Sequence, residues 1–342
     1  MIFVVNSGSS SLKFALYTKT LDEVAAGVVA DVTDHAQALK TVLSRHPLAS
    51  LTAAAHRVVH GGTALTGPCR ITPDVVAQIA ALCPLAPLHN PAALATIRAL
   101  QALAPDLPQY ASFDTAFHAT NPEVAVRYAI PHGLHEAGIR RYGFHGLSYA
   151  SLVGRVPPVP RLLACHLGNG ASLCAILDGR SVATTMGYSP LDGLTMGTRS
   201  GGIDGNAVLA LAGQVGIDGA ADILNRQSGL LALGGSNDMR KVTPFARHHF
   251  AYWATRHAGS MIAAMGGLDA VAFTGGIGEN DHAMRAMILD GLAFMGVAYD
   301  APANRQNARV LHDAASRVAI WTVAAQEERH IAMEARQVME AA

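Results

Sequence analysis

Residues 162–177 read LLACHLGNGASLCAIL and decide the fold that this sequence predicts. Two apolar runs flank a glycine-rich bend, which is the pattern of a β-hairpin with an open turn. Gly168 and Gly170 carry no Cβ, so backbone N–H groups of the bend can come close to a ligand. A concave set of N–H groups favours anions, phosphate above all. The hairpin is therefore predicted to bind a phosphate group.

The same plan occurs at the N-terminus, where residues 2–17 contain an apolar run, a serine-rich bend and a second apolar run. Ser11-Leu12 corresponds there to Ser172-Leu173 of the first hairpin. A third turn, the glycine-rich segment 274–280, ends another apolar run. One such turn alone would be interpreted as an ordinary loop. Three together predict a duplicated domain whose halves hold one nucleotide.

Length and composition favour a two-domain globular protein. The chain has 342 residues, of which 50% are hydrophobic and 15% charged. Lys and Arg balance Asp and Glu at 25 each, so neither nucleic acid nor an acidic membrane surface is an expected partner. Asn6 interrupts the first apolar run, and no apolar run approaches the roughly 20 residues of a membrane span. We expect no signal peptide, no membrane contact and a cytoplasmic location.

The cysteines and histidines do not predict a zinc site. None of the four cysteines has metal-ligand spacing. Cys165 and Cys174 could face each other across the hairpin, but buried thiols are the expected state in a reducing cytosol. His56 and His60 are four residues apart, yet their neighbours have the pattern of a strand and not of a zinc-binding helix.

Further periodic segments are predicted around these turns. Apolar runs indicate strands at residues 53–62, 110–115 and 318–323. Helical spacing indicates helices at residues 34–43, 72–82, 91–103 and 245–265.

Two charged residues stand within apolar strands. Arg57 is either a guanidinium that grips a carboxylate or phosphate, or half of an internal salt bridge. Asp114 ends its strand between Phe113 and Phe117, where a carboxylate suits catalysis, although it could also cap a helix. The pattern leaves both alternatives open.

Two further candidates lie beside glycines. His145 stands between Phe144 and Gly146 and is either a positioned hydrogen-bond donor or a buried core histidine. Arg199 lies in the glycine-dense loop 193–205, which is either a surface turn or an anion site that closes over its ligand.

Three residues are candidates for metal or phosphate binding. Asn6 lies at the mouth of the first bend and could hold Mg²⁺, or could be a simple turn residue. Lys13 is predicted to point away from the core face of its strand. Its ammonium group would then lie either beside a phosphate or in solvent. Glu327 begins the final helix, either as a metal ligand or as a complement to the helix dipole.

Standard nucleotide motifs are absent. There is no G-x-x-x-x-G-K-[ST] and no protein-kinase set. The third glycine of G-x-G-x-x-G is replaced by Leu173 in one turn and by Asp281 in another. The sequence therefore predicts neither a P-loop protein nor a dinucleotide-binding domain.

Ordered blocks along nearly the whole chain resemble the acetate kinase family, which includes propionate and butyrate kinases. They are NSGSSSLKF (6–14), HRVVHGG (56–62), PLHNP (87–91), FDTAFH (113–118), RRYGFHG (140–146), HLGNGAS (166–172), GTRSG (197–201), FTGGIGEN (273–280) and EE (327–328).

The resemblance implies an α/β fold of duplicated ribonuclease-H-like domains, as in actin and sugar kinases, with the active site in the cleft between them. The first domain would comprise residues 1–118 plus 328–342. The second, nucleotide-binding domain would comprise residues 119–327. The resemblance also implies a homodimer.

The implied activity is reversible, Mg²⁺-dependent phosphorylation of a short-chain carboxylate by ATP, giving an acyl phosphate and ADP by direct in-line transfer. Acetate is the first candidate substrate, with propionate or butyrate as alternatives, and Mn²⁺ is the alternative metal. A phosphatase and a non-catalytic nucleotide switch on the same fold are the rival functions. Neither rival requires Arg57 beside an apolar pocket.

By resemblance, Arg57 binds the carboxylate, Asp114 orients the site and the metal, and His145 and Arg199 stabilise charge on the transferred phosphoryl group. The metal ligands would be Asn6 and Glu327. The substrate pocket would be formed by Arg57, Val59, Leu88, Phe144 and Pro190. The nucleotide-binding residues would be Lys13, His166, Leu167, Gly168, Asn169, Gly170, Asp238, Met239, Arg240, Gly276, Ile277, Gly278, Glu279 and Asn280.

The sequence departs from the family pattern at several places. It is shorter than typical members, with trimmed segments at residues 151–162 and before His56. Gly202 replaces an acidic residue that we expect near Arg199, and Ala93 replaces an asparagine. The implied catalytic residues are all present, so we expect activity.

Overall fold

The computed structural model describes residues 1–8, 11–46 and 48–341. Ser9 and Ser10 of the serine-rich bend lie outside the described residues. The chain divides into two compact units, and each is described by itself. Unit 1 comprises Met1–Ala119 and Gln326–Ala342, and unit 2 comprises Thr120–Ala325.

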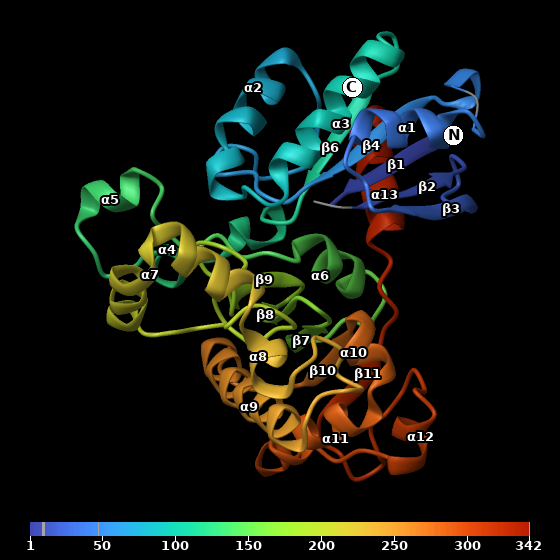
Figure 1. Ribbon diagram of the computed structural model, residues 1–342. Coiled ribbons are helices and arrows are strands. Elements are labelled where there is room, and N and C mark those ends of the chain that lie inside the picture. Colours follow the sequence, from blue (N-terminus) through green and yellow to red (C-terminus); the bar gives the residue numbers. More distant parts are fainter. Residues whose placement is uncertain (9–10, 47, 342) are drawn as a thin grey trace. The chain divides into compact units, whose positions relative to one another are not determined.

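Unit 1 is built on a mixed six-stranded sheet with the order β3-β2-β1-β4-β6-β5. β1, β2 and β3 are antiparallel neighbours, whereas β1, β4 and β6 run parallel (Figure 1). The strands are β1 (Ile2–Ser7), β2 (Ser11–Tyr17), β3 (Glu23–Ala30), β4 (Ala53–Val58), β5 (Cys69–Arg70) and β6 (Gln109–Phe113). The helices are α1 (His35–Leu43), α2 (Pro73–Ala81), α3 (Asn90–Leu103) and α13 (Glu327–Glu340), with short 3-10 turns η1 (Leu48–Ser50) and η2 (Cys83–Leu85).

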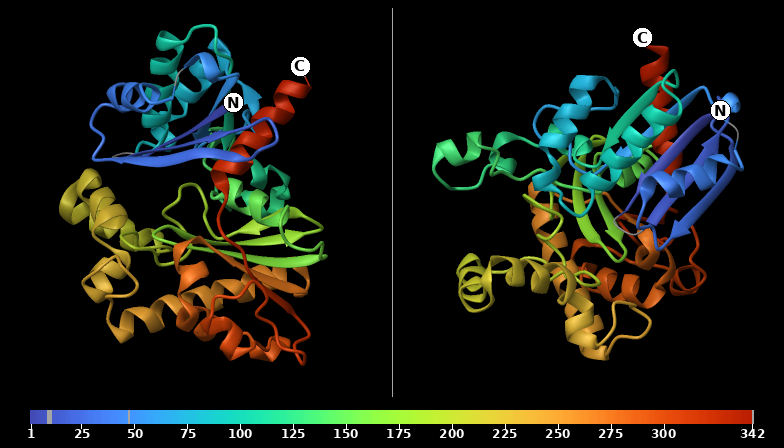
Figure 2. Two further views of the ribbon diagram at one scale, coloured as in Figure 1. Left: turned by 90° about the vertical axis from the view of Figure 1, so that its right-hand side faces the viewer. Right: turned by 45° about the horizontal axis from the view of Figure 1, so that its top comes forward.

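Local chemistry explains where the helices of unit 1 begin. The Asp34 side chain accepts the N–H groups of Ala36 and Gln37 and so caps α1. Thr72 caps α2, which has Pro73 in its first turn. Phe3 and Val5 of β1 pack in one buried cluster with side chains of α1 and α3. The C-terminal helix α13 packs against β1, β4 and β6 and is drawn in red beside this sheet in Figure 2.

Unit 2 is built on a five-stranded sheet with the order β11-β10-β7-β8-β9. Its strands are β7 (Arg161–Leu167), β8 (Ala171–Leu177), β9 (Arg180–Thr184), β10 (Ala270–Thr274) and β11 (Ala319–Thr322). Its helices are α4 (Glu123–Val126), α5 (His132–Glu136), α6 (Gly146–Val153), α7 (Gly205–Arg226), α8 (Gly229–Gly234), α9 (Pro244–Met265), α10 (Gly275–Asn280), α11 (His282–Asp290) and α12 (Ala301–Arg305). The 3-10 turn η4 (Ala293–Met295) also belongs to unit 2, whereas the 3-10 turn η3 (Ala116–Thr120) lies at the end of unit 1 and reaches the first residue of unit 2.

The two sheets share one topology. In each, three consecutive antiparallel strands are followed by parallel strands added on the far side of the first strand. The hairpin β1–β2 of unit 1 therefore corresponds to β7–β8 of unit 2, and β5 is an additional edge strand. This repetition confirms the predicted duplicated α/β fold, and the four predicted helices appear as α1, α2, α3 and α9.

Two local predictions are wrong, each for a physical reason, and one possibility that the sequence left open is excluded. The strand expected to reach residue 62 ends at Val58, because the Asn90 side chain bonds both the N–H and the C=O of His60. The turn expected at 274–280 is the helix α10, which Gly275 starts with a φ of +79°. Cys165 and Cys174 do not face each other, since Leu173 pairs with Cys165 and Ala164 with Cys174. Both cysteines are buried free thiols, as predicted.

By length and composition alone, helix α7 is long and apolar enough to cross a membrane. This differs from the expectation that no apolar run approaches the length of a membrane span. Gly216 interrupts it with φ +78° and ψ 166°, so two helical pieces meet there. A membrane-spanning helix has to satisfy its backbone hydrogen bonds internally. This interruption makes α7 a poor candidate for such a span.

A buried histidine makes the stability of unit 1 dependent on pH. Burial lowers the pKa of His56 from 6.5 to about 4, although the hydrogen bond between His56 and Gln109 opposes the shift. Between those values the unfolded chain binds a proton that the folded chain excludes, so stability falls as the pH falls. At pH ~5 the loss for this one group should be about 2 kcal/mol.

Urea unfolding at several pH values checks this expectation. His56→Gln should reduce the dependence of unfolding free energy on pH between 6.5 and about 4, and the dependence that remains should come in part from His60, whose pKa burial also lowers to about 4. His248→Gln, at an exposed position of α9, is the control and should keep the wild-type slope. An unchanged slope in His56→Gln would contradict the assignment.

Candidate functional site

Polar side chains of unit 1 gather where its parallel strands end. Asn6 lies at the end of β1, Arg57 near the end of β4, and Asp114 directly after β6. Because β1, β4 and β6 are adjacent and parallel, their carboxyl ends share one edge of the sheet. Ligands of α/β sheets bind at such edges.

Arg57 and Asp114 form a two-pronged ion pair at this edge. Arg57 Nε lies 3.0 Å from Asp114 Oδ1, and Arg57 Nη2 lies 2.6 Å from Asp114 Oδ2. The Asp114 side chain is 2% exposed, whereas that of Arg57 is 22% exposed. The pair therefore fixes the guanidinium while part of it stays accessible to a ligand.

The pair belongs to a larger cluster with an excess of negative charge. Arg57 Nη1 donates to Asn6 Oδ1 at 3.3 Å and lies 3.9 Å from Glu327 Oε2. Asn6 Nδ2 donates to Glu328 Oε1 at 3.4 Å. Burial opposes the charge of Arg57, but Asp114 and Glu327 outweigh it and raise the pKa of Arg57. The pKa of Glu327 is raised, first by burial and then by Asp114 and Glu328, while Arg57 opposes the shift.

The chemistry of these residues would suit a divalent cation such as Mg²⁺. Oxygen atoms of Asn6, Glu327 and Glu328 are the hard ligands that Mg²⁺ prefers, and a cation would relieve the repulsion among the carboxylates. Among the described residues no group of three or more His, Cys, Asp or Glu could hold a metal. Mg²⁺ commonly has few protein ligands and completes its shell with water and phosphate.

The remaining predicted residues of unit 1 lie close to this edge in the fold. Lys13 of β2 is exposed and pairs with Asn6 across the hairpin. Val59 follows β4 and is buried, and Leu88 is half-buried just before α3.

In unit 2 the β7–β8 bend is surrounded by His145, His166 and Arg199. The rings of His145 and His166 stack with centroids 4.1 Å apart. His145 Nδ1 lies 2.9 Å from the Ser172 hydroxyl, and His166 Nδ1 lies 2.8 Å from the Ser148 hydroxyl. His145 has a left-handed φ of 58° immediately before α6. Hydrogen bonding and stacking therefore fix both rings.

Gly170 allows this arrangement. A Cβ at this position would lie 2.7 Å from Arg199 Nη2 and 3.1 Å from His145 Nε2. The absence of a side chain at Gly170 lets both groups pack against the bend.

Arg199 is a half-buried cation without a carboxylate partner among the described residues. Its Nη1 donates to the carbonyl oxygen of Pro190 at 2.6 Å, and no ion pair of the described chain includes it. Burial lowers the pKa of Arg199 to about 10. An anionic ligand would supply the missing charge. Phe144, next to His145, is buried, and Pro190 is half-buried.

Gly202, where we expected an acidic residue near Arg199, lies beside Asp192. A Cβ at Gly202 would face Asp192 Oδ1 at 3.4 Å. An acidic side chain at this position would therefore begin beside another carboxylate, not beside Arg199.

A pocket of about 600 Å³ lies next to the bend, within unit 2. Arg240 donates to both oxygens of Asp238 at 2.9 and 2.7 Å, and this contact lowers the pKa of Asp238 to about 2. The described residues that line the pocket are Gly168, Asn169, Asn237, Asp238, Met239, Arg240, Arg247, Gly276, Ile277, Asn280, Asp281 and His282. A polar-rimmed pocket of this size suits a nucleoside.

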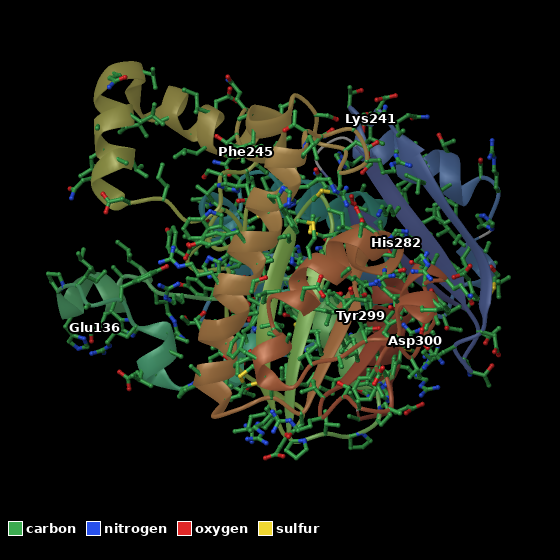
Figure 3. The ribbon with its side chains drawn as sticks, turned by 90° about the horizontal axis from the view of Figure 1, so that it is seen from below. Glu136, Lys241, Phe245, His282, Tyr299 and Asp300 are labelled. Atoms are coloured by element: carbon green, nitrogen blue, oxygen red, sulfur yellow. The ribbon has the colours of Figure 1, made fainter. Side chains whose placement is uncertain are left out.

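The pocket contains most, but not all, of the predicted nucleotide residues. The predicted residues that are not among the described lining residues are Lys13, His166, Leu167, Gly170, Gly278 and Glu279. Four lining residues were missed by sequence reasoning: Asn237, Arg247, Asp281 and His282, the last labelled in Figure 3. Asp281 and His282 directly follow FTGGIGEN, so their position was a usable signal, whereas Arg247 gave none.

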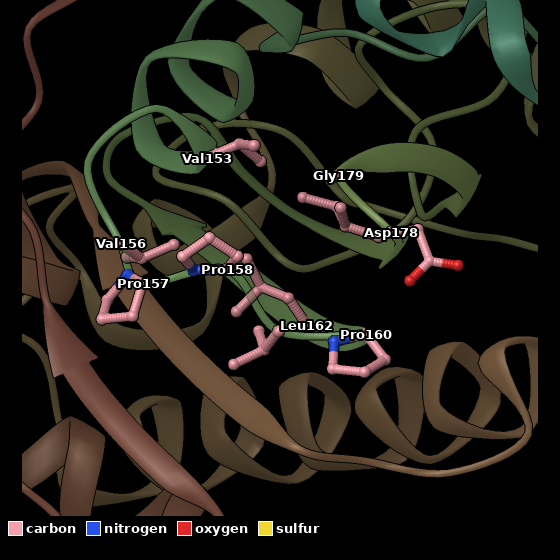
Figure 4. A pocket seen from close by; sticks show the side chains of 10 residues that line it. Val153, Val156, Pro157, Pro158, Pro160, Leu162, Asp178 and Gly179 are labelled. Carbon is pink, nitrogen blue, oxygen red and sulfur yellow. The ribbon is translucent and has the colours of Figure 1, made fainter.

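A second pocket of about 500 Å³ lies at the opposite end of β7 and β8 (Figure 4). Its walls are mainly apolar and include Pro157, Pro158, Pro160 and Leu162. Asp178 is the one titratable residue among the described residues that line it. None of the predicted site residues is among them.

Comparison with known proteins agrees with the resemblance seen in the sequence. The profile of the acetokinase family matches residues 26–333. The acetate kinase of Rhodopseudomonas palustris is 40% identical, and the alignment covers 97% of this chain and 96% of the relative. That alignment is 384 positions long, so the relative contains segments that this 342-residue chain lacks.

Solved structures are also similar over nearly their full length. A crystal structure of Porphyromonas gingivalis acetate kinase has a TM-score of 0.90 at 32% identity and covers 99% of both chains. A propionate kinase from Francisella tularensis has a TM-score of 0.90 at 36% identity and covers 97% of this chain and 98% of its own. These similarities confirm the family resemblance.

The packing of Gly170 gives a direct structural test. Gly170→Ala should displace the Arg199 guanidinium and the His145 ring, because a Cβ would overlap both. Gly259→Ala, in α9 with open space around it, is the control and should leave both in place. Crystal structures of the two variants decide the point, and an unmoved Arg199 in Gly170→Ala would contradict it.

Proposed function

Because the chain belongs to the acetokinase family, we propose that it transfers the γ-phosphoryl group of ATP to acetate, reversibly, giving acetyl phosphate and ADP. The observation that carries this proposal is Arg57, held by Asp114 yet partly exposed beside an apolar residue, Val59. Such a guanidinium can bind one anionic carboxylate in a defined orientation.

The first step is binding of the carboxylate by unit 1. Arg57 N–H groups that are not directed at Asp114 would hold the acetate oxygens. Acetate is already ionised at neutral pH, so no general base is needed to create the nucleophile. For the methyl group the resemblance assigns Val59 and Leu88 of unit 1 and Phe144 and Pro190 of unit 2, and we retain this assignment as part of the proposal.

Asn6 and Glu327 are the proposed magnesium ligands, with Asp114 orienting them through Arg57. Magnesium, when bound, neutralises charge on the phosphate oxygens. Glu328 adds a further carboxylate to the cluster, and its bond to Asn6 positions the amide. Lys13, paired with Asn6 across the hairpin, would add a positive charge near the phosphates.

Unit 2 is the proposed nucleotide-binding unit. The pocket beside α10 would hold the adenosine, with Asp238, Met239 and Arg240 on one wall and Gly276, Ile277 and Asn280 on the other. The bend from His166 to Gly170 would bind the phosphates through backbone N–H groups.

His145 and Arg199 are the proposed stabilisers of the transferred phosphoryl group. Phosphoryl transfer spreads negative charge over the equatorial oxygens, so catalysis depends on positioning and on preorganised positive charge. Arg199 lacks a carboxylate partner among the described residues and is free to neutralise that charge. In-line transfer requires that these groups and the carboxylate bound by Arg57 act on the same phosphorus atom.

Removal of Arg57 is the sharpest functional test. Arg57→Ala should raise the KM for acetate about a hundredfold or more, because a charge-assisted pair of hydrogen bonds is lost. The KM for ATP should change only about twofold, and free guanidinium should restore part of the activity. Acyl phosphate trapped as the hydroxamate gives the rate. Arg70→Ala, at an exposed position of β5, is the control and should behave as wild type.

An unchanged acetate KM in Arg57→Ala would contradict carboxylate binding by this residue. Phosphate release that does not depend on an acceptor would favour the phosphatase alternative. Nucleotide binding without turnover would favour the switch.

Propionate is the second candidate acceptor, favoured by the similarity to the Francisella tularensis propionate kinase. A comparison of kcat/KM across formate, acetate, propionate and butyrate separates the two. A higher value for propionate than for acetate would assign the chain to that alternative.

We also propose that the protein is a cytoplasmic homodimer. Four free cysteines suit a reducing compartment. The resemblance implies the dimer, and α7 carries exposed apolar side chains that a second copy could cover: Leu209 is 70% and Ile217 81% exposed.

Light scattering tests the dimer. The wild-type chain should have twice the monomer mass, and Leu209→Lys with Ile217→Lys should reduce it to the monomer mass, because buried charge is costly. Val28→Lys, on the exposed face of β3 in unit 1, is the control and should stay dimeric. A wild-type monomer at all concentrations would contradict the proposal.

A further inference from the structure

Glu279 has contacts that differ from those of a nucleotide ligand. Its Oε1 accepts the backbone N–H of Gly275 at 2.9 Å and the backbone N–H of Ala325 at 2.9 Å. The described residues that line the proposed adenosine pocket include Asn280 but not Glu279. We propose that Glu279 is a positioning residue, which ties α10 to the segment that leads into α13 and thereby positions Glu327.

The helix that carries Glu279 is itself fixed at both ends. At its start, Gly275 has a φ of +79°, and a Cβ there would lie 2.7 Å from the Leu167 carbonyl oxygen. At its other end, Arg285 Nη1 donates to the carbonyl oxygens of Gly278 and Glu279, each at 2.9 Å. The short helix α10 is therefore a rigid base for the Glu279 carboxylate.

Arg285 is in turn fully buried and saturated by neutral oxygens. Its Nε donates to Asn304 Oδ1 at 2.8 Å, and its Nη2 donates to the Asn304 carbonyl and to Asn307 Oδ1, both at 2.7 Å. A buried guanidinium with this number of partners cannot rotate without losing several hydrogen bonds. The backbone carbonyl of Glu279 is therefore held in place by Arg285, independently of the Glu279 carboxylate.

The segment between β11 and α13 is attached to unit 2 by three successive contacts. Val323 N–H donates to the Phe273 carbonyl oxygen at 2.8 Å and extends the strand pairing. The Ala324 carbonyl oxygen accepts Arg155 Nη1. Ala325 N–H donates to Glu279. Of these contacts, the one with Glu279 lies nearest to α13 and is the one made by a carboxylate.

The contact between Glu279 and Ala325 matters because Ala325 lies close to Glu327 in the chain. Glu327, the first residue of α13, lies two residues after Ala325 and 3.9 Å from Arg57 Nη1. Loosening the chain at Ala325 would loosen the residue that, on the proposed function, binds magnesium. This inference rests on that function for its effect on the reaction, but the contact with Ala325 can be tested without it.

Two variants separate positioning from nucleotide binding. Glu279→Ala removes both hydrogen bonds. Glu279→Gln keeps a carbonyl oxygen that can accept the same N–H groups, so it should retain much of the wild-type behaviour. Asn280→Ala, at a neighbouring residue that lines the pocket, is the comparison for a true loss of nucleotide contact.

Hydrogen exchange tests the contact. In Glu279→Ala the amides of Gly275 and Ala325 should exchange at least about tenfold faster than in wild type, because a charge-assisted bond is lost. In Glu279→Gln the increase should be smaller. Unchanged exchange at Ala325 in Glu279→Ala would overturn the inference.

Binding and kinetics test the role in the reaction. Titration calorimetry with ADP in the absence of magnesium should give a Kd within about twofold of wild type for Glu279→Ala, but a weaker Kd for Asn280→Ala. The magnesium concentration for half-maximal acyl phosphate formation should rise about tenfold in Glu279→Ala. A weakened ADP Kd with unchanged magnesium dependence would make Glu279 a nucleotide ligand and overturn the inference.

These outcomes are separable from failure of the proposed function. If the wild-type chain formed no acyl phosphate, the proposed activity would be wrong. Exchange at Ala325 would still decide whether Glu279 holds this segment.

Discussion

The ion pair between Arg57 and Asp114 is the interaction on which the site in unit 1 depends. It spans 57 residues of sequence and forms because β4 and β6 are adjacent parallel strands. Breaking such a pair by removing one partner typically costs about 3 to 5 kcal/mol, since an uncompensated charge is left behind. The strand order of the sheet therefore determines where the guanidinium is, and Asp114 determines how it is oriented.

The charges of the two units are complementary to different ligands. Around Arg57 the carboxylates of Asp114, Glu327 and Glu328 leave an excess of negative charge, which suits a divalent cation. Around the β7–β8 bend, Arg199 is half-buried and has no carboxylate partner among the described residues, which suits an anion. Magnesium and phosphate are the pair of charges that phosphoryl transfer brings together.

The duplicated hairpin explains how one architecture supports both sites. In each unit the first strand carries a polar residue near its carboxyl end, Asn6 in β1 and His166 in β7. In each, the return strand begins at a small polar bend. The same backbone geometry thus presents a side-chain amide in unit 1 and glycine N–H groups in unit 2, where Gly170 leaves room for Arg199. Within the unit 2 bend the Gly168 N–H itself donates to the Gly170 carbonyl oxygen at 2.9 Å.

Periodicity and turn residues were sufficient to predict the repeated hairpins and the four helices α1, α2, α3 and α9. What the sequence could not provide was set by tertiary contacts. The Asn90 side chain ends β4 from 30 residues away, and hairpin register separates Cys165 from Cys174.

For the candidate site too, the sequence indicated residue types but not the tertiary contacts between them. Arg57 and Asp114 stood out because charges are uncommon in apolar strands, but their pairing needed the order of the sheet. Arg247 lines the pocket from α9 and Glu279 faces Ala325, and neither contact leaves a local pattern in the sequence.

Direct transfer to a carboxylate can be measured by following a heavy oxygen isotope placed in the carboxyl group of acetate. The account predicts that, with ATP and magnesium, phosphorus NMR detects acetyl phosphate in which the labelled oxygen is bonded to phosphorus, formed in equal amount with ADP. Unlabelled inorganic phosphate, released at the same rate with and without acetate, would contradict it.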